Sequence, residues 1–431
     1  MERSDKRYGT YVRILESELV PAMGCTEPIA VAFCAAKARE ALGMMPEKVD
    51  VKVSGNIIKN VKSVVVPNTG GLAGMEVAAA AGIAFGKAEK ELECIAEATE
   101  EDKERMRQLL KDAEFSVAPT YGTEVLEIII KLEAQGHTSM ARIVKRHANV
   151  VCVEKDGKVL FEKNADDDQA DDGKPDKSLL NIKDIYDFAK TCDIRDVQGP
   201  ILRQAACNTA ISAEGLNGNW GASVGKSVLE FKGDSLRNRA IAAAAAGSDA
   251  RMSGCELPVV IVSGSGNQGI TASMPVITYA KALGKSEEEM IRAMVMSDLT
   301  ALHQKAGIGP LSAFCGAMCA ASGAGAGIAF LQGASEEEIE KVIITSLGQI
   351  SGMICDGAKA SCAAKIASSL DAAVMGSKMA LAGRVYQPDE GLVLDNIDET
   401  IKSVGYVGRV GMKETDIEIL HVMLGDRDLS I

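Results

Sequence analysis

Aromatic residues are scarce in this chain of 431 residues, at 4%, and only one residue is tryptophan. No uninterrupted apolar run reaches the 18 residues typical of a membrane-spanning helix. The charged start MERSDKR lacks the apolar core that a secretory signal peptide would need. An excess of basic residues is also lacking: Lys and Arg number 47 against 60 Asp and Glu, and the net charge of -13 argues against nucleic-acid binding. These absences predict a cytoplasmic protein that acts on a small molecule and binds neither nucleic acid nor membrane.

Histidine is rare as well, and the four histidines form no HExxH motif or close cluster, which argues against a histidine-ligated zinc hydrolase. Cysteine is the residue type that stands out instead. Its eleven copies are scattered along a chain without an export signal, so they are expected to be reduced, buried or bound to metal rather than paired in disulfides.

Composition and pattern predict two domains of different kinds. The chain is 47% hydrophobic and long enough to bury a large core. β-Branched residues in alternation predict a strand pair over 49–68, and another pair is expected over 150–163. The acidic segment 164–178 is predicted to be an exposed linker, after which helical patterns predominate. We therefore predict an α+β protein in which a mixed domain (1–180) packs on a helix-rich domain (181–431), with the site where they meet.

Two helix starts share a serine followed three residues later by a glutamate, at Ser286 and Ser335, the signature of a capping box. Either an internal duplication or ordinary helix capping explains the similarity. The second helix is predicted to run from Ser335 to Cys355, where an Asp-Gly pair breaks it and another helix begins. Cys355 is thus expected at a helix C-terminus and Cys362 in the first turns of the next helix.

Four cysteines stand in distinctive surroundings. Cys25 lies in PAMGCTEP, where prolines and a glycine hold it outside regular helix and a glutamate follows two residues later. Cys315 lies in GPLSAFCGAMC, and Cys355 and Cys362 lie in MICDGAKASC. Thiolates are ligands that soft metals and iron–sulfur clusters select. From spacing alone, the last three could hold one metal centre or be buried thiols, and Cys319 is a reserve ligand.

A glycine-rich loop in VIVSGSGNQGITASMPV (260–276) joins a strand-like segment to a helix. Its glycines fit GxGxxG, but the acidic partner of a dinucleotide site is not evident. Backbone N–H groups at such a turn bind anions, so we prefer a carboxylate-binding loop to a purely structural turn. The candidate substrate-binding residues are Gly264, Ser265, Gly266, Asn267 and Gln268 of this loop, together with Asn68 from the N-terminal half of the chain.

Together, PAMGCTEP, SGSGNQGI, GPLSAFCG and CDGAKASC resemble the L-cysteine desulfidase family, a YhaM-like group related to the α chain of iron–sulfur L-serine dehydratases. The resemblance extends from about residue 21 to residue 376. It implies a pyridoxal-phosphate-independent lyase that converts L-cysteine to pyruvate, ammonia and hydrogen sulfide. It also implies one [4Fe–4S] cluster per chain, with one iron open to substrate. By this resemblance Cys25 is the proton acceptor, and Cys315, Cys355 and Cys362 are the cluster ligands.

Two other functions stay open at this point. An L-serine dehydratase would use the same site with hydroxide as the leaving group. A three-cysteine zinc site, completed by a residue such as Cys319, would instead link the helices of a small-molecule-binding protein. The Gly- and Ala-rich helical part is compatible with a homo-oligomer in each case.

Overall fold

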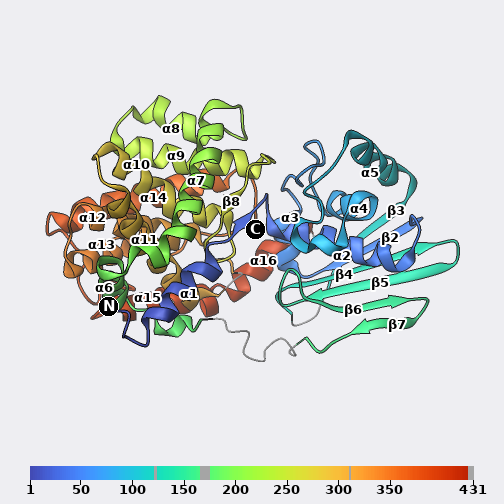
Figure 1. The fold of residues 1–431 in the computed structure, drawn as a ribbon, viewed down its shortest axis with the longest axis horizontal. Coiled ribbons are helices and arrows are strands. Elements are labelled where there is room, and N and C mark those ends of the chain that lie inside the picture. Colours follow the sequence, from blue (N-terminus) through green and yellow to red (C-terminus); the bar gives the residue numbers. More distant parts are fainter. Residues whose placement is uncertain (121–123, 166–174, 310–311, 426–431) are drawn as a thin grey trace, which may run out of the picture.

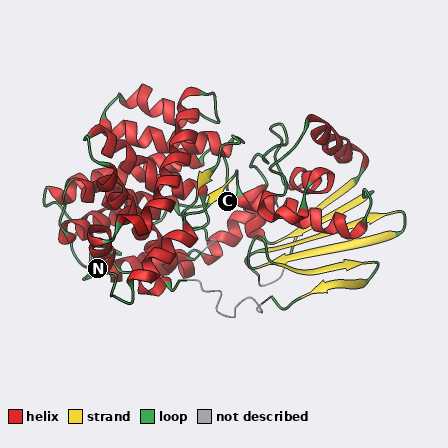
Figure 2. Ribbon diagram, viewed as in Figure 1, coloured by secondary structure: helices red, strands yellow, loops and turns green. Residues whose placement is uncertain are grey.

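The computed structural model describes residues 1–120, 124–165, 175–309 and 312–425, which form two lobes side by side (Figure 1). One lobe combines a sheet with covering helices, and the other is almost entirely helical (Figure 2). The predicted α+β class, with the sheet in the N-terminal half and helices in the C-terminal part, is confirmed.

The sheet lobe contains the elements α2 (Thr26–Leu42), β2 (Lys48–Val53), α3 (Gly55–Val61), α4 (Met75–Phe85), η1 (Ala88–Glu93), α5 (Glu100–Asp112), β3 (Glu114–Pro119), β4 (Glu127–Ala134), β5 (His137–Val144), β6 (Val150–Lys155) and β7 (Lys158–Glu162). The strands follow the order β3-β2-β4-β5-β6-β7, in which β2 and β3 are parallel and all other neighbours are antiparallel. Burial alternates along β4, where Ile130 and Leu132 are buried and Lys131 and Glu133 are exposed. This period of two is expected for a sheet covered on one face.

Helices α2 and α4 cover the buried face of the sheet (Figure 1). They approach each other closely because Gly82 of α4 lies against the backbone of Ala32 in α2, and a Cβ at Gly82 would overlap the Ala32 carbonyl. Gly43 ends α2 with a φ of 81°, the left-handed C-cap that the sequence predicts. The packing fixes the start of α2, and therefore the position of Cys25.

The helical lobe contains α1 (Tyr8–Glu18), η3 (Lys177–Leu179), α6 (Ile182–Thr191), α7 (Ile194–Asn217), α8 (Val224–Lys232), α9 (Leu236–Met252), α10 (Gly266–Ala282), α11 (Glu287–Ile308), α12 (Ala317–Leu331), α13 (Glu336–Gln349), α14 (Cys362–Leu381), α15 (Ile397–Tyr406) and η4 (Val407–Gly411). Small residues dominate its interior: every residue from Ala240 to Met252 and from Ala317 to Ala329 is buried. Such side chains let helix backbones pack closely. This packing explains the high alanine and glycine content.

Several contacts cross between the lobes. The first strand, β1 (Pro21–Ala22), precedes the sheet lobe but pairs with β8 (Val259–Val260) of the helical lobe. The last helix, α16 (Lys413–Leu424), extends from the helical lobe onto α3. α1 packs into the helical core although it lies at the start of the chain. The boundary at residue 180 stays a prediction, and the chain crosses between the lobes on both sides of it.

Some local predictions are confirmed and others are wrong. The strand pair over 150–163 and both capping boxes are present. Within 49–68 only the first five residues belong to a strand, β2, because residues 55–61 form α3. The helix that starts after Ser335 ends at Gln349, so Cys355 lies in a loop rather than at a helix C-terminus. Most of the predicted linker 164–178 lies outside the described residues.

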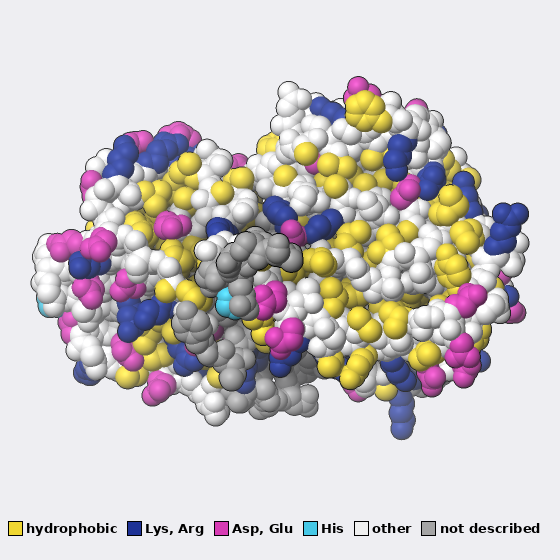
Figure 3. Space-filling view, turned by 180° about the vertical axis from the view of Figure 1, so that it is seen from behind, with side chains coloured by type: hydrophobic (Ala, Val, Ile, Leu, Met, Phe, Trp, Pro, Cys, Tyr) yellow, Lys and Arg dark blue, Asp and Glu magenta, His cyan; other side chains and the backbone are white. Residues whose placement is uncertain are grey.

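Within the described ranges, every helix is too short or too polar to cross a membrane. Figure 3 shows the back of the molecule, where acidic and basic side chains are interspersed over both lobes rather than separated by sign.

Candidate active site

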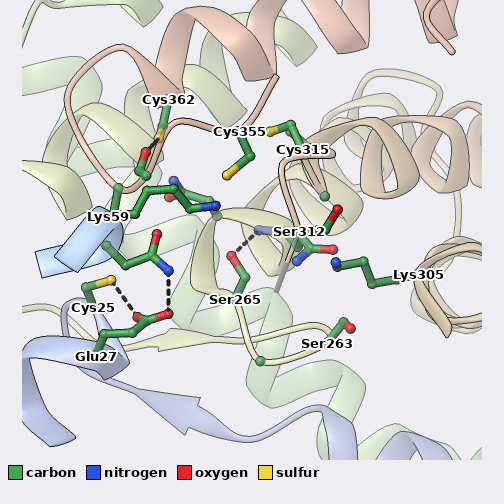
Figure 4. A pocket seen from close by; sticks show the side chains of 18 of the residues that line it. Cys25, Glu27, Lys59, Ser263, Ser265, Lys305, Ser312, Cys315, Cys355 and Cys362 are labelled. Atoms are coloured by element: carbon green, nitrogen blue, oxygen red, sulfur yellow. Dashed lines mark hydrogen bonds between the residues drawn. The ribbon is translucent and has the colours of Figure 1, made fainter. Parts of the chain in front are cut away.

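A cavity of about 530 Å³ lies between the two lobes and is lined by both. The sheet lobe contributes the start of α2, the end of α3 and the loops 124–126 and 145–147. The helical lobe contributes the end of α9, the start of α10 and the loops before α12 and α14. The four cysteines singled out from the sequence all line this cavity: Cys25, Cys315, Cys355 and Cys362 (Figure 4).

Four helices begin at the cavity: α2, α10, α12 and α14. Cys25 is the N-cap of α2, and Ser265 is the N-cap of α10. Cys315 stands two residues before α12, and Cys362 is the first residue of α14, as predicted. Each helix N-terminus carries a partial positive charge of about half an elementary charge. Their convergence favours negatively charged groups such as thiolates and carboxylates.

Cys315 and Cys355 are held together by their backbones. The N–H of Cys315 donates to the carbonyl of Met353 at 2.8 Å, and the N–H of Cys355 donates to the carbonyl of Ala313 at 2.6 Å. An antiparallel bridge between Phe314 and Ile354 joins the same two segments. This extended pairing replaces the helix predicted up to Cys355, and it presents both thiols on the cavity wall.

The electrostatic surroundings of the three thiols differ. Cys315 and Cys355 share a side-chain hydrogen bond, which lowers the pKa of Cys355 and raises the pKa of Cys315. The Lys59 ammonium group lowers the pKa of Cys355 further. Cys362 donates from Sγ to the Gly357 carbonyl at 3.6 Å, and burial raises its pKa. One thiol of the three is therefore set up to ionise first.

Cys25 forms a separate polar group with two neighbours from the sheet lobe (Figure 4). Its Sγ donates to Oε2 of Glu27 at 3.0 Å, and Nδ2 of Asn60 donates to Oε1 of Glu27 at 3.2 Å. Burial and then the negative charge of Glu27 raise the pKa of Cys25 well above its ordinary value. The thiol is protonated at neutral pH, and the Glu27 carboxylate is a proton acceptor within hydrogen-bonding reach.

The glycine-rich loop joins β8 to α10, as the sequence predicts. Its backbone is left-handed at Ser263 (φ 50°) and Gly264 (φ 74°), which turns the chain toward the cavity. Gly266 is buried behind the loop against Arg251, where a Cβ would overlap the guanidinium group. The predicted loop residues that line the cavity are Gly264, Ser265, Asn267 and Gln268.

Arg251 is a cavity residue that the sequence interpretation missed. It is only 4% exposed, donates from Nη2 to the carbonyl of Gly24 at 2.7 Å and from Nη1 to Oδ1 of Asn267 at 3.2 Å. Its Nε has no partner, and no carboxylate among the described residues pairs with it. A buried guanidinium without a carboxylate is suited to bind one from a ligand. The sequence feature that could have identified Arg251 is a charged residue within the run of small residues that forms α9.

Comparison with known proteins decides the family. Residues 89–421 match the family model described as serine dehydratase alpha chain. The chain belongs to this family. Among its relatives are the UPF0597 protein DSY1109 of Desulfitobacterium hafniense, 49% identical over 98% of both chains, and a UPF0597 protein of Lachnoclostridium phytofermentans, 48% identical over 97% of this chain and 100% of the relative. A UPF0597 protein of Treponema denticola is 43% identical over 99% of this chain and 100% of its own.

Membership in the serine dehydratase alpha chain family indicates a serine dehydratase-like lyase. The matched range contains Cys315, Cys355 and Cys362 and begins after Cys25. The family assignment thus agrees with the coarse reaction class expected from the sequence.

An iron–sulfur cluster, which a dehydratase of this kind would carry, must fit the thiols that are present. Among the described residues, no three His, Cys, Asp or Glu side chains gather closely enough to hold a single metal ion. A four-iron cluster binds each thiolate through a different iron, so three thiols from one wall are a suitable donor set. Three thiols on one cavity wall, beside buried cations and helix N-termini, fit such an anionic group.

Besides Gly266, two predicted candidates do not line this cavity. Cys319 is buried in α12, where burial raises its pKa to about 11, and it does not line the cavity wall. Asn68 donates from Nδ2 to the carbonyls of Ile95 and Ala96, at 2.9 and 3.1 Å. It lines a separate hollow beside α5. The predicted role of Asn68 in substrate binding therefore has no support from its position.

Two buried lysines were also missed, and both line the cavity. Lys59, on α3, is 3% exposed and forms an ion pair with Asp416 of α16. Lys305, near the end of α11, is 4% exposed. Figure 4 shows Lys59 extending between Cys25 and the other three thiols, with Lys305 on the right, below Ser312. The sequence feature that could have identified Lys305 is a lysine that follows the largely apolar stretch of the helix α11.

Proposed function

We propose that this chain is a pyridoxal-phosphate-independent iron–sulfur lyase that removes sulfide from L-cysteine, giving pyruvate, ammonia and hydrogen sulfide. The observation that carries the proposal is the meeting of Cys25 and three further cysteines at one interlobe cavity. Membership in the serine dehydratase alpha chain family supports an elimination reaction on a small amino acid.

Cys315, Cys355 and Cys362 would hold the cluster. Three protein thiolates leave one iron of a [4Fe–4S] cluster without a protein ligand. When bound, the cluster supplies a Lewis acid that stabilises the departing thiolate of the substrate. The Lys59 and Lys305 ammonium groups and the N-termini of α12 and α14 stabilise the negative charge of these ligands.

Arg251 and the glycine-rich loop would hold the substrate carboxylate. The guanidinium is already oriented by Gly24 and Asn267, so binding a carboxylate costs little side-chain entropy. Gln268 is buried with its Oε1 unpartnered, so it can accept a hydrogen bond from the substrate ammonium group. These contacts place the Cα–H bond between the loop and α2.

Cys25 would take the proton from Cα. Because its thiol is protonated in the free protein, it must first pass that proton to Glu27, whose Oε2 lies 3.0 Å away. Arg251 lowers the pKa of Cys25 and so stabilises the thiolate that forms. The thiolate then accepts the Cα proton as the β-substituent leaves. The resulting aminoacrylate hydrolyses in water to pyruvate and ammonia.

A second candidate is L-serine dehydratase, which the description of the matching family favours. The same residues would bind the same amino and carboxylate groups, with water as the final leaving group. The two substrates differ only in the atom at Cβ, and relative turnover separates the two activities.

The test is anaerobic purification followed by assay of iron, acid-labile sulfide, and pyruvate and hydrogen sulfide formed from L-cysteine or L-serine. About four irons per chain with sulfide release support the desulfidase. Pyruvate from L-serine alone would replace it with the dehydratase, and a reconstituted protein without iron or turnover would contradict both.

The role of Cys25 has its own test. Cys25→Ala is expected to keep its iron and lose about 10²–10⁴-fold in kcat, the usual contribution of a general base. Cys34→Ala, which changes a buried thiol in the middle of the same helix, is the matched control. Full activity of Cys25→Ala with an intact cluster would show that another residue is the base.

A further inference from the structure

The hollow beside α5 that Asn68 lines is a second cavity, of about 640 Å³. Its walls come from the ends of α2 and α4, the chain between η1 and α5, and the first turns of α5. Among the described residues, none lines both this hollow and the interlobe cavity. A ligand in the hollow would therefore contact neither the four thiols nor the glycine-rich loop.

Arg39 makes this hollow a candidate binding site. It belongs to the last turn of α2, and its side chain is half-buried. Its Nη2 donates to the carbonyl of Gly86 at 3.5 Å, and its Nε is buried without a hydrogen-bond partner. The neighbouring carboxylate, Glu40, pairs with Lys37 instead. An unsatisfied N–H on a cation without a counter-charge costs free energy, which an anion in the hollow would offset.

The other charged side chains of the wall already have partners. Glu97 accepts a hydrogen bond from Lys87 at 2.6 Å, and Asp102 forms an ion pair with Arg105. Each carboxylate that lines the hollow thus has a cation of its own. Of the three cations that line it, Arg39 is the one without a carboxylate among the described residues.

Hydrogen bonds of the surrounding backbone fix the shape of the hollow. Nδ2 of Asn68 holds the carbonyls of residues 95 and 96. The N–H of Lys87 donates to the carbonyl of Cys94 at 2.9 Å, which closes the segment between them on itself. Thr99 begins α5 with a capping box. Because these contacts form the walls without a ligand, binding one requires little ordering of the chain.

The chemistry of the wall indicates the kind of ligand. A guanidinium group binds a planar carboxylate through two parallel N–H···O bonds. The apolar residues Ala84, Phe85 and Ala98 also line the hollow and suit a short hydrocarbon chain. Repulsion from the two acidic residues of the wall grows with the charge of the ligand, so a singly charged anion is favoured over phosphate.

We propose that the hollow beside α5 binds a small monocarboxylate, separately from the active site, and that Arg39 binds its carboxylate group. The inference does not depend on the proposed lyase activity, because no residue of the interlobe cavity takes part in it.

The test is hydrogen exchange of the full chain with increasing sodium propionate, at constant ionic strength. We expect propionate to slow exchange of the backbone amides in 84–87 and 96–99. Arg39→Gln should raise the propionate concentration needed for this protection about 10- to 100-fold, the loss expected for a hydrogen bond to a charged group. Arg39→Lys keeps the charge without the planar fork and should give a smaller loss.

Arg107→Gln is the matched control, because Arg107 lies on α5, pairs with Glu104 and does not line the hollow. It should leave the protection by propionate unchanged. Protection confined to 264–268 would place propionate in the active site and overturn the inference. Protection of 84–99 by sodium phosphate alone, or equal protection by propionate in wild type and Arg39→Gln, would overturn it as well.

The wild-type exchange pattern tests the site even if a variant of Arg39 does not fold. Unchanged exchange in 84–87 and 96–99 at saturating propionate would overturn the proposal on its own.

Discussion

At the scale of single residues, burial and then the charge of Glu27 raise the pKa of the Cys25 thiol. The Glu27→Gln variant removes a negative charge that raises the pKa of Cys25. Because the thiolate is the active form and appears as pH rises through this pKa, the rising limb of kcat/KM is expected to move to lower pH. The plateau should fall, because the proton acceptor 3.0 Å from Sγ is lost.

The pH profile of kcat/KM for Glu27→Gln checks this expectation. Glu124→Gln serves as the control, because Glu124 lines the same cavity and the hydrogen bond of the Cys25 thiol goes to Glu27. A rising limb that stays in place in Glu27→Gln would mean that Cys25 does not set the pH dependence.

Arg251 is expected to bind the substrate rather than to take part in proton transfer. Arg251→Gln should raise KM about 10- to 100-fold, since a hydrogen bond to a charged group contributes ~1.5–3 kcal/mol. The value of kcat should change much less. The control is Arg237→Gln on the same helix, where the arginine pairs with Asp371. An unchanged KM in a folded Arg251→Gln enzyme would rule out the carboxylate contact.

The sequence predicts the residues that carry recognisable motifs and misses those that act through position alone. The four cysteines and most of the glycine-rich loop meet at the cavity as expected. Arg251, Lys59 and Lys305 belong to three separate helices, and no spacing relates them. Only tertiary packing brings their charges together. Asn68 is the reverse case. Its side chain is of a type that could bind substrate, but it donates hydrogen bonds to the backbone carbonyls of residues 95 and 96 instead.

At the scale of elements, the loop between Cys355 and Cys362 depends on a glycine. Gly357 has a φ of 96°, and a Cβ there would overlap the carbonyl of Lys59. Gly357→Ala should therefore displace the loop from α3, at a cost of about 1–3 kcal/mol from the backbone conformation alone. We expect less iron per chain after reconstitution.

Iron content and the Tm of Gly357→Ala measure this effect. Gly352→Ala is the control from the segment before Cys355, because a Cβ there meets no atom within 4 Å. Equal iron content in the two variants would show that cluster binding does not depend on Gly357.

Helices were predicted better than the segments between them. Capping residues fixed the starts of α11 and α13 because a serine and a glutamate act locally on the first turn. The apolar residues within 57–66 fit the pattern of a strand. Three of them, Ile57, Ile58 and Val61, instead pack into the core from α3. Short apolar runs do not distinguish strand from helix, so neighbouring elements decide.

At the scale of the whole molecule, α16 joins the two lobes beside the cavity. Asp416 pairs with Lys59, and Leu420 packs against Gly55 at the start of α3. Asp416→Asn should destabilise the lobe contact by about 1–3 kcal/mol, because a buried ammonium group loses its counter-charge. Hydrogen exchange of the α3 amides is expected to become faster.

Exchange rates and urea unfolding of Asp416→Asn test this role of α16. Glu414→Gln changes an exposed carboxylate in the first turn of the same helix and should leave exchange in α3 unchanged. If both variants protect α3 equally well, the helix does not hold the lobes together through this ion pair.

The pairing of β1 with β8 attaches the segment before Cys25 to the helical lobe. Pro21 and Ala22 are bonded to the helical lobe, and Arg251 of that lobe also holds the carbonyl of Gly24. Cys25 follows directly, so it is anchored to the lobe that carries the other three thiols even though α2 belongs to the sheet lobe. A hinge between the lobes would therefore lie after Cys25. Its motion would shift the wall formed by 124–126 and 145–147 and admit substrate, while Cys25 keeps its place relative to the other three thiols.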